Sequence, residues 1–204
     1  MDTQDLHLGR LDGEAETDGL APTPWRAHLL DALHHAATGL VNRVELSDVL
    51  SHLITNVCLL VNTPHAFVEL ITADGQHMQG LVNRGLFAGD PLQLGRGHGM
   101  VGKIWQSGQP LNISDYQHWS DRADTTIAQQ VQSSLGVPIR WGEQIIGVLG
   151  VARSEPGDPF GDADLDGLQR FAALIALAYE NTRLIQVERR NHRVAESLRD
   201  MVMI

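Results

Sequence analysis

The sequence has almost no cysteine and comparatively few basic residues, and each shortage excludes a class of protein. Cys58 is the only cysteine among 204 residues, so one chain can form neither an internal disulfide framework nor a two-cysteine redox cycle. It lies in the apolar run 57–61, which predicts a buried, unreactive thiol. Lysine and arginine total 15 against 25 acidic residues, for a formal charge of −10. A nucleic-acid-binding surface needs clustered basic side chains, so no nucleic-acid partner is predicted.

Long apolar runs are also missing. No stretch approaches the roughly 20 apolar residues that a membrane-spanning helix requires. Residues 1–5 do not show the basic and then apolar profile of a secretion signal. The sequence therefore predicts a cytoplasmic protein with no membrane partner.

The chain does contain enough apolar material for one globular domain. Hydrophobic residues form 43% of the sequence and charged residues 20%, a balance typical of a folded domain with tails. Residues 1–23 are acidic and lack hydrophobic periodicity, which predicts a mobile leader. We expect the domain over residues 24–183 and a separate helical segment over 184–204.

Hydrophobic periodicity and turn residues predict the order of elements of an α+β domain. The strand over 144–152 is nearly all apolar, so it is expected at the centre of a sheet that is covered on both faces. The expected elements are helices over 25–42 and 47–61, strands over 66–71 and 78–83, a short helix over 99–107, a strand over 111–113, a short helix within the connection 114–128, strands over 133–140 and 144–152, and a long helix from Asp162.

The most distinctive segment is 94–110, which is rich in glycine. Gly97 to Gly102 fits the G-x-G-x-x-G pattern of dinucleotide-binding sites, which requires a preceding strand, a full-length helix and an acid about 20 residues later. Here Gly108 and Pro110 stop the helix early, and Lys103 lacks the surroundings of a P-loop lysine. The segment is either a nucleotide cradle or the wall of a sensory pocket, and the short helix favours the second.

Three signatures in this order resemble those of the GAF domain, a small-molecule sensory module related to the PAS domain. They are the segment from Gly97 to Pro110, the hairpin from Ser134 to Leu149 with its Val-Pro-Ile and Gly-Val-Leu runs, and the helix start from Phe160 to Ala172. The resemblance covers about residues 25–183. It implies a central antiparallel sheet of five or six strands, with helices packed on one face, a ligand pocket on the other and a long C-terminal signalling helix.

The resemblance places the pocket beneath the glycine-rich segment, its short helix and the loop after the next strand. In that loop, residues 115–122 combine aromatic side chains with a cation and acids, a mixture that can stack on a planar ligand and fix its polar edge. The same aromatic side chains would fill the pocket of a domain used only as a scaffold, so both interpretations stay open. The candidate pocket residues are His98, Met100, Val101, Ile104, Trp105, Tyr116, His118, Trp119 and Arg122.

The sequence leaves the ligand and any cofactor unknown. Bilin-binding relatives usually carry a cysteine in the pocket region or the leader, and free methionine sulfoxide reductases of this fold carry several pocket cysteines. The lone Cys58 in the second helix therefore argues against a covalently bound bilin and against the reductase activity. The Asn-Lys…Phe…Asp-Glu pattern of cyclic-nucleotide-binding relatives is absent. Haem stays open, with His98 and His118 as candidate ligands, although a plain surface or hydrogen-bonding role is favoured. No metal-site or catalytic-triad spacing occurs, so neither a metal nor an enzymatic activity is predicted.

The C-terminal segment carries a heptad pattern. Its apolar residues alternate at spacings of three and four over three repeats, which favours a coiled-coil homodimer. Asn191 occupies an a position, where a lone asparagine selects a parallel two-stranded register. Arg183 and Glu188 are expected to pair between chains. The alternative is a single amphipathic helix packed on its own domain. The predicted dimer interface consists of Leu184, Val187, Asn191, Val194, Leu198 and Met201.

Together these features predict a small-molecule-sensing, dimerising regulatory input domain of a signal-transduction protein. A histidine kinase of a two-component system and a cyclic-nucleotide signalling enzyme are examples of such a protein. The expected partners are a small-molecule ligand, a second copy of the chain and a covalently linked output domain. Two alternatives remain, a ligand-free dimerisation scaffold and a small enzyme of the same fold.

Overall fold

The computed structural model describes residues 46–89, 94–157 and 159–202. The predicted leader over 1–23 and the predicted first helix over 25–42 lie outside the described residues. The elements are the helices α2 (Leu46–Leu60), α3 (Gly99–Ser107) and α4 (Asp162–Val202), the 3-10 turn η1 (Gly85–Phe87), and the strands β1 (His65–Ile71), β2 (His77–Arg84), β3 (Leu94–Gly95), β4 (Leu111–Ile113), β5 (Ser133–Trp141) and β6 (Gln144–Arg153).

The six strands form one antiparallel sheet in the order β3-β2-β1-β6-β5-β4. β6 pairs with β1 on one side and with β5 on the other, and its residues 147–152 are all buried. A strand with neighbours on both edges and packing on both faces has little room for polar side chains. The predicted central position of this apolar strand is therefore confirmed.

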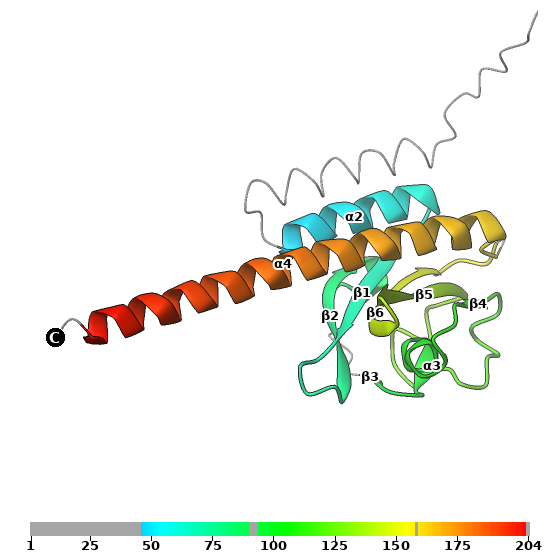
Figure 1. Ribbon diagram of the computed structural model, residues 1–204. Helices are drawn as coiled ribbons and strands as arrows, with labels where there is room; N and C mark the ends of the chain where they lie inside the picture. Colours follow the sequence, from blue (N-terminus) through cyan, green and yellow to red (C-terminus); the bar gives the residue numbers. More distant parts are fainter. Residues whose placement is uncertain (1–45, 90–93, 158, 203–204) are drawn as a thin grey trace, which may run out of the picture.

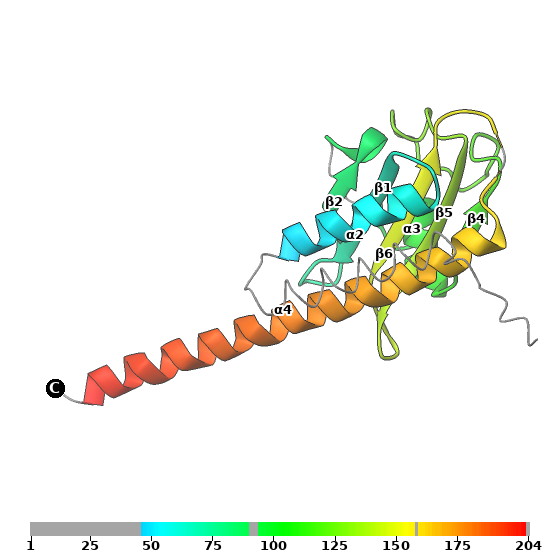
Figure 2. The same cartoon turned by 90° about the horizontal axis from the view of Figure 1, so that it is seen from above.

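One face of the sheet is covered by α2 and α4, which lie side by side in both ribbon views (Figures 1 and 2). β1 illustrates how alternation divides side chains between the faces, because Val68 packs toward these helices and Phe67 packs on the opposite face. Large side chains without solvent exposure fill this helical face, among them Leu50 and Ile54 of α2, Leu168 and Ile175 of α4, and Leu135 and Leu149 of the sheet.

The opposite face of the sheet is covered by α3 and by the connection 114–132 (Figure 1). α3 packs on it through the buried side chains of Met100 and Ile104. The connection contains turns and no helix, so the predicted short helix within 114–128 is wrong. Asp115 accepts a hydrogen bond from the N–H of His118 and Thr125 from that of Ala128, and each bond closes a local turn that no helical run follows.

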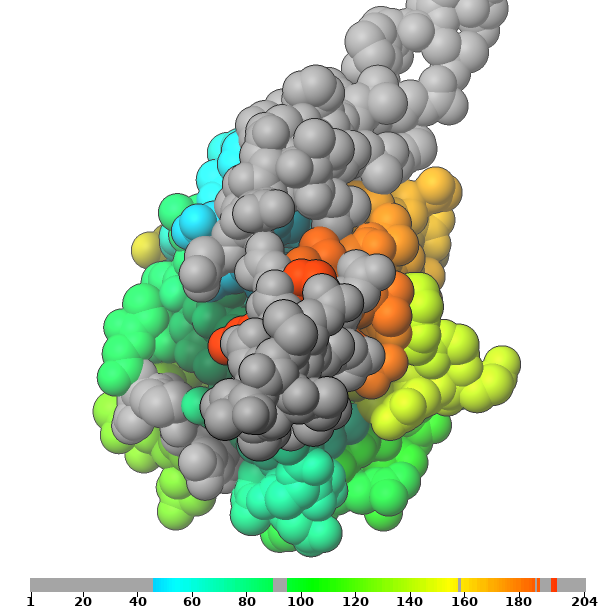
Figure 3. Space-filling model, turned by 60° about the vertical axis from the view of Figure 1, so that its left-hand side comes forward, coloured from blue at the N-terminus to red at the C-terminus, as the bar shows by residue number. Residues whose placement is uncertain are grey.

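α4 begins at the predicted residue and runs far beyond the sheet. Asp162 and Asp164 lie in its first turn, and the Asp164 carboxylate accepts a hydrogen bond from the N–H of Gly161 at 2.8 Å. Figures 1 and 2 show the later part of α4 projecting from the domain, and Figure 3 shows the earlier part of α4 in orange on the surface of the domain. Within the described ranges, no helix combines the length and hydropathy needed to cross a membrane.

Candidate functional site

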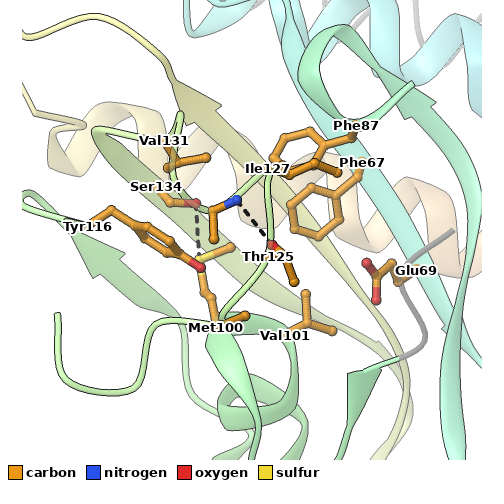
Figure 4. A pocket seen from close by; sticks show the side chains of 12 residues that line it. Phe67, Glu69, Phe87, Met100, Val101, Tyr116, Thr125, Ile127, Val131 and Ser134 are labelled. Atoms are coloured by element: carbon orange, nitrogen blue, oxygen red, sulfur yellow. Dashed lines mark hydrogen bonds between the residues drawn. The ribbon is translucent and has the colours of Figure 1, made fainter. Parts of the chain in front are cut away.

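A small cavity lies between the sheet and the connection 114–132, beside α3 (Figure 4). The space inside it that the centre of a water molecule can reach is about 50 Å³. Its wall is mostly apolar and aromatic. β1 contributes Phe67 and Glu69, η1 contributes Phe87, α3 contributes Met100 and Val101, β5 contributes Ser134, and the connection contributes Tyr116, Ala123, Thr125, Ile127, Ala128 and Val131.

The glycine-rich segment forms a tight turn that seats α3. The N–H of Gly97 donates to the carbonyl of Gly102 at 2.9 Å, and the N–H of Gly102 donates to the carbonyl of His98 at 3.0 Å. A Cβ at Gly102 would collide with the carbonyl oxygen of Gly95, so glycine permits this close approach. These backbone amides are used within the turn, and β3 is a two-residue strand at the edge of an antiparallel sheet. A nucleotide cradle of the Rossmann type is therefore excluded.

Three of the predicted pocket residues line the cavity, namely Met100, Val101 and Tyr116. The sulfur of Met100 accepts a hydrogen bond from the hydroxyl of Ser134 at 3.2 Å, which ties α3 to β5. Tyr116 is buried, and its burial raises the pKa of its phenol. Helix and connection thus each supply part of the cavity wall.

Ile104, Trp105 and Trp119 belong to the core around the cavity and do not line it. Ile104 is fully buried and Trp105 nearly so, and the Arg96 guanidinium lies 5.9 Å from the Trp105 ring centroid. The half-buried Trp119 stands with its ring centroid 5.6 Å from that of Tyr116. These three side chains hold the lining residues in place.

His98, His118 and Arg122 lie outside the cavity. His98 is exposed, with Nδ1 3.3 Å from the carbonyl oxygen of Arg96. The side chain of His118 is 86% exposed and pairs with Asp115 at 2.8 Å. Arg122 donates to the side-chain oxygen of Gln117. Each group finds a local polar partner near the surface, so neither histidine is placed to hold a haem in this cavity.

Sequence reasoning missed Glu69, Phe67 and Phe87. Glu69 is the most informative of them, because it is only 8% exposed and its Oε2 has no hydrogen-bond partner within the described part of the chain. Burial raises the pKa of its carboxyl group to about 7. The available signal was an acid in the middle of the apolar strand 66–71, since a buried polar residue is more informative than a buried apolar one.

Polar contacts hold the connection 114–132 over the cavity. The side-chain amide of Gln117 donates to the carbonyl oxygens of Ala128 and Val131. At the outer surface, Lys103 of α3 forms an ion pair with Asp121 at 3.0 Å. The connection 114–132, which roofs the cavity, is thus attached to α3 by a partly exposed ion pair, and Gln117 links the early part of the connection to its end.

The single thiol lies away from this cavity. Cys58 is half-buried and packs against the core between the sheet and the helices α2 and α4. Burial raises the pKa of the thiol, and the nearby Arg84 guanidinium lowers it by less, so the thiol is protonated near neutral pH. No group of three or more metal-binding side chains occurs among the residues that the structure describes.

The family model for the GAF domain matches residues 45–179. The chain belongs to the GAF domain family. The match runs from α2 through every strand of the sheet into the first half of α4. The resemblance seen in the three sequence signatures is thereby confirmed.

Known GAF relatives include both signalling proteins and enzymes. The dual 3′,5′-cyclic-AMP and -GMP phosphodiesterase 11A of Takifugu rubripes is 24% identical over 177 residues, which cover 79% of this chain and 20% of that protein. The chain therefore spans about a fifth of the length of that relative.

Two solved structures show the likeness in the fold. The GAF domain of a phosphoenolpyruvate-protein phosphotransferase from Coxiella burnetii gives a TM-score of 0.67 at 16% identity, over 79% of this chain and 98% of that one. The free methionine-R-sulfoxide reductase of Neisseria meningitidis, in complex with its substrate, gives 0.65 at 16% identity, over 79% and 91%. At these identities the likeness establishes the fold alone.

Proposed function

We propose that this GAF domain is a small-molecule-sensing, dimerising regulatory input domain of a signal-transduction protein, with an output domain linked to its C-terminal helix. The observation that carries the proposal is a cavity whose roof is connected through the sheet to the helix that leaves the domain. Regulatory GAF domains occur in signalling proteins such as the phosphodiesterase above. The histidine-kinase context and the cytoplasmic location stay predictions from the sequence.

Two contacts support a route from the cavity to α4. On β5, the hydroxyl of Ser134 reaches the cavity, while the next residue, Leu135, packs in the core beneath α4. On β4, the side chain of Asn112 donates to the carbonyl of Phe160 at 2.7 Å, two residues before α4 begins. The connection 114–132 follows β4 directly, so a ligand that displaces the connection also displaces the start of α4. The packing of the terminal helices is then the two-state element.

Exposed apolar side chains on α4 support the dimer. Leu184 is 54% exposed and Val187 49% exposed, and both belong to the predicted heptad stripe. Leu177, 43% exposed, lies one heptad before Leu184 and extends the stripe toward the domain. Such a row is suited to burial against the same row of a second copy.

The ion pair expected between Arg183 and Glu188 of two chains stays a prediction from the sequence. Arg183 makes two hydrogen bonds to Glu180 of its own chain, at 2.8 and 2.9 Å. Because this guanidinium already has a carboxylate one turn away, pairing with Glu188 of a second chain is not needed to satisfy it.

Sedimentation equilibrium tests the dimer. The wild-type chain should sediment as a dimer, and the double variant Leu184→Glu/Val187→Glu should dissociate at least about tenfold more easily, because two charges enter an apolar seam. Arg193→Glu is the matched control, since it places the same side chain at an exposed c position of the heptad. Asn191→Leu should tighten the coil or change its oligomer order. Monomers for both wild type and Asn191→Leu would overturn the coiled-coil proposal.

Native mass spectrometry of the protein purified from its own host tests ligand sensing. A dimer that carries extra mass per chain supports the sensing proposal, and the extra mass gives the molecular mass of the ligand. A dimer at the bare sequence mass favours the second candidate, a ligand-free scaffold. That candidate is supported by the small cavity of about 50 Å³, which the rings of Phe67, Phe87 and Tyr116 partly fill.

An enzymatic role has less support. The likeness to the free methionine-R-sulfoxide reductase is one of fold. The only cysteine of this chain packs on the face of the sheet away from the cavity, so no thiol lines the cavity.

A further inference from the structure

The cavity contains a carboxyl group that the protein itself does not satisfy. Glu69 is 92% buried on β1, since its exposed fraction is 8%, and no hydrogen bond reaches its Oε2 from the described residues. Leaving a buried charged group without a partner is strongly unfavourable. Figure 4 shows the carboxyl group among the side chains that line the cavity. A ligand that donates hydrogen bonds at this point would supply the missing partner.

A second unsatisfied acceptor lies on the same face of the sheet. Asn83 of β2 is paired with Phe67 of β1, and Gly80 is paired with Glu69, so all four positions share the cavity face. Gly80 leaves room for the Asn83 amide, because a Cβ there would lie 2.6 Å from Asn83 Nδ2. Asn83 Oδ1 is buried and also has no partner among the described residues. Two neighbouring acceptors therefore lack donors.

The remaining wall suits a cation with an alkyl body. The rings of Phe67 and Phe87 meet edge to face with centroids 4.7 Å apart, and Met100 and Val101 add apolar surface. Aromatic rings attract ammonium groups. Among the residues that the structure describes, no lysine, arginine or histidine lines the cavity, so an anionic ligand would meet Glu69 without a compensating charge from them.

The volume of the cavity limits the size of the group that enters it. A drug-sized ligand occupies a pocket of roughly 300–1,000 Å³, whereas this cavity offers about 50 Å³ and is partly open to solvent. A nucleotide does not fit this space without displacement of the connection 114–132. A small head group fits with its body directed outward.

We propose that the cavity recognises a compact primary amine, whose ammonium group donates a hydrogen bond to Glu69 while its alkyl body packs on Phe67 and Phe87. The inference rests on the proposed sensing function and names the chemical class of its ligand. The ammonium group carries a charge opposite to that of the ionised Glu69 carboxylate, and it supplies the hydrogen-bond donor that Oε2 lacks in the described residues.

The test is a titration of the full chain, labelled with ¹³C at the methionine methyl groups, with n-butylammonium chloride at constant ionic strength. Met100 lines the cavity, and the variant Met100→Leu identifies its resonance. A ligand of about five heavy atoms is expected to bind with a dissociation constant on the order of 1 mM. The Met100 signal should therefore shift and saturate at millimolar amine, and n-butanol and butyrate at the same concentrations should leave it in place.

Two variants show whether Glu69 carries the recognition. Glu69→Gln keeps the shape and removes the charge, and it should weaken n-butylammonium binding by at least about tenfold. Glu143→Gln removes an exposed carboxylate in the β5–β6 turn and should leave the binding unchanged. Circular dichroism of both variants confirms that they fold.

The outcomes separate the amine inference from the sensing proposal. Equal amine affinity in wild type and Glu69→Gln overturns the assignment of Glu69. A Met100 shift with butyrate or n-butanol but not with the amine overturns the amine class and leaves a ligand-binding sensor. No saturable shift with any of the three compounds overturns the amine inference. If native mass spectrometry then also shows only the bare chain mass, the sensing proposal fails as well.

Discussion

The two faces of the sheet are built from the same strands and differ in how they are filled. The face beneath α2 and α4 is packed with aliphatic side chains and the rings of Phe160 and Phe171. The face beneath α3 and the connection 114–132 has a cavity, and it carries both buried side-chain oxygens that lack a partner in the described residues, on Glu69 and Asn83. The first face is filled as a stabilising core. The second keeps space and unsatisfied polarity, which is the arrangement of a binding site.

This difference shows how one domain combines stability with binding. Unsatisfied buried polar groups reduce the free energy of unfolding, and the close-packed helical face offsets that loss. Matched substitutions on the two faces therefore should differ in their effects on stability.

The largest expected effect is the loss of an aromatic side chain from the packed face. Phe171→Ala should lower the free energy of unfolding by about 3–5 kcal/mol, because Phe171 is 1% exposed and its neighbours cannot close the space. Phe67→Ala on the cavity face should cost less, about 2–3 kcal/mol, since the vacated space joins a cavity that water can enter. Urea unfolding of both variants measures the difference. An equal or larger loss for Phe67→Ala would contradict the contrast between the faces.

The next effect concerns the pH dependence that Glu69 imposes on stability. Its folded pKa of about 7 lies above its ordinary value of 4.5, and burial alone causes the shift. Between these values the folded chain binds more protons than the unfolded chain, so stability falls as the pH rises. With each pKa unit worth about 1.4 kcal/mol, the loss between pH 5 and pH 8 should be about 2–3 kcal/mol.

Urea unfolding of wild type and Glu69→Gln at pH 5 and pH 8 checks this value. The difference between the two proteins isolates Glu69 from every other titratable group, because both proteins share those groups. Between pH 5 and pH 8, the free energy of unfolding of Glu69→Gln should fall by about 2–3 kcal/mol less than that of the wild type. Parallel pH profiles would show that Glu69 is ionised in the folded chain throughout.

Added volume should be tolerated on one face and not on the other. Ala128 lines the cavity, and Ala176 is buried in the packed face. Ala176→Leu should lower the free energy of unfolding by about 1–3 kcal/mol through overpacking, whereas Ala128→Leu should change it by less than about 1 kcal/mol because the side chain enters existing space. Thermal unfolding gives both numbers. Ala128→Leu should also remove the Met100 response to n-butylammonium, and a retained response would place the amine elsewhere.

The smallest effect is expected at the roof of the cavity. Asp121→Asn removes the partly exposed ion pair with Lys103 and should cost about 0.2–1 kcal/mol, as such surface pairs do. Its stability should lose the dependence on salt that this pair contributes. A cost above about 2 kcal/mol in urea unfolding would show that the roof is as closely packed as the helical face.

Much of the fold was predictable because its signals are local. The periodicity of 47–61 and 162–185 marks helices, Gly75 and Gly142 mark hairpin turns, and the apolar run 144–152 marks a central strand; each is read from neighbouring residues. The predicted short helix in 114–128 failed for the opposite reason. The connection folds into turns that bury Tyr116, Ala128 and Val131 against distant residues of the sheet and α3, and no local pattern marks those contacts.

The cavity was only partly predictable. Family resemblance correctly predicted three lining residues, Met100, Val101 and Tyr116. It also predicted three polar residues of the same segments, but these contact other partners outside the cavity, namely His98, His118 and Arg122. A segment can be assigned to a pocket from its sequence. Which of its side chains enters the pocket depends on the packing of the whole segment against the sheet.

By itself the sequence determined the family, the order of elements and the heptad stripe on α4, since each depends on residues close together in the chain. Only the tertiary structure decided that Glu69 and Asn83 share one face with Phe67, beneath α3 and the connection. That juxtaposition comes from the pairing of β1 with β2 and from α3 packing on a distant strand. Whether a buried carboxyl group has a hydrogen-bond partner depends on such long-range contacts. These contacts cannot be predicted from the sequence of the strand that carries Glu69.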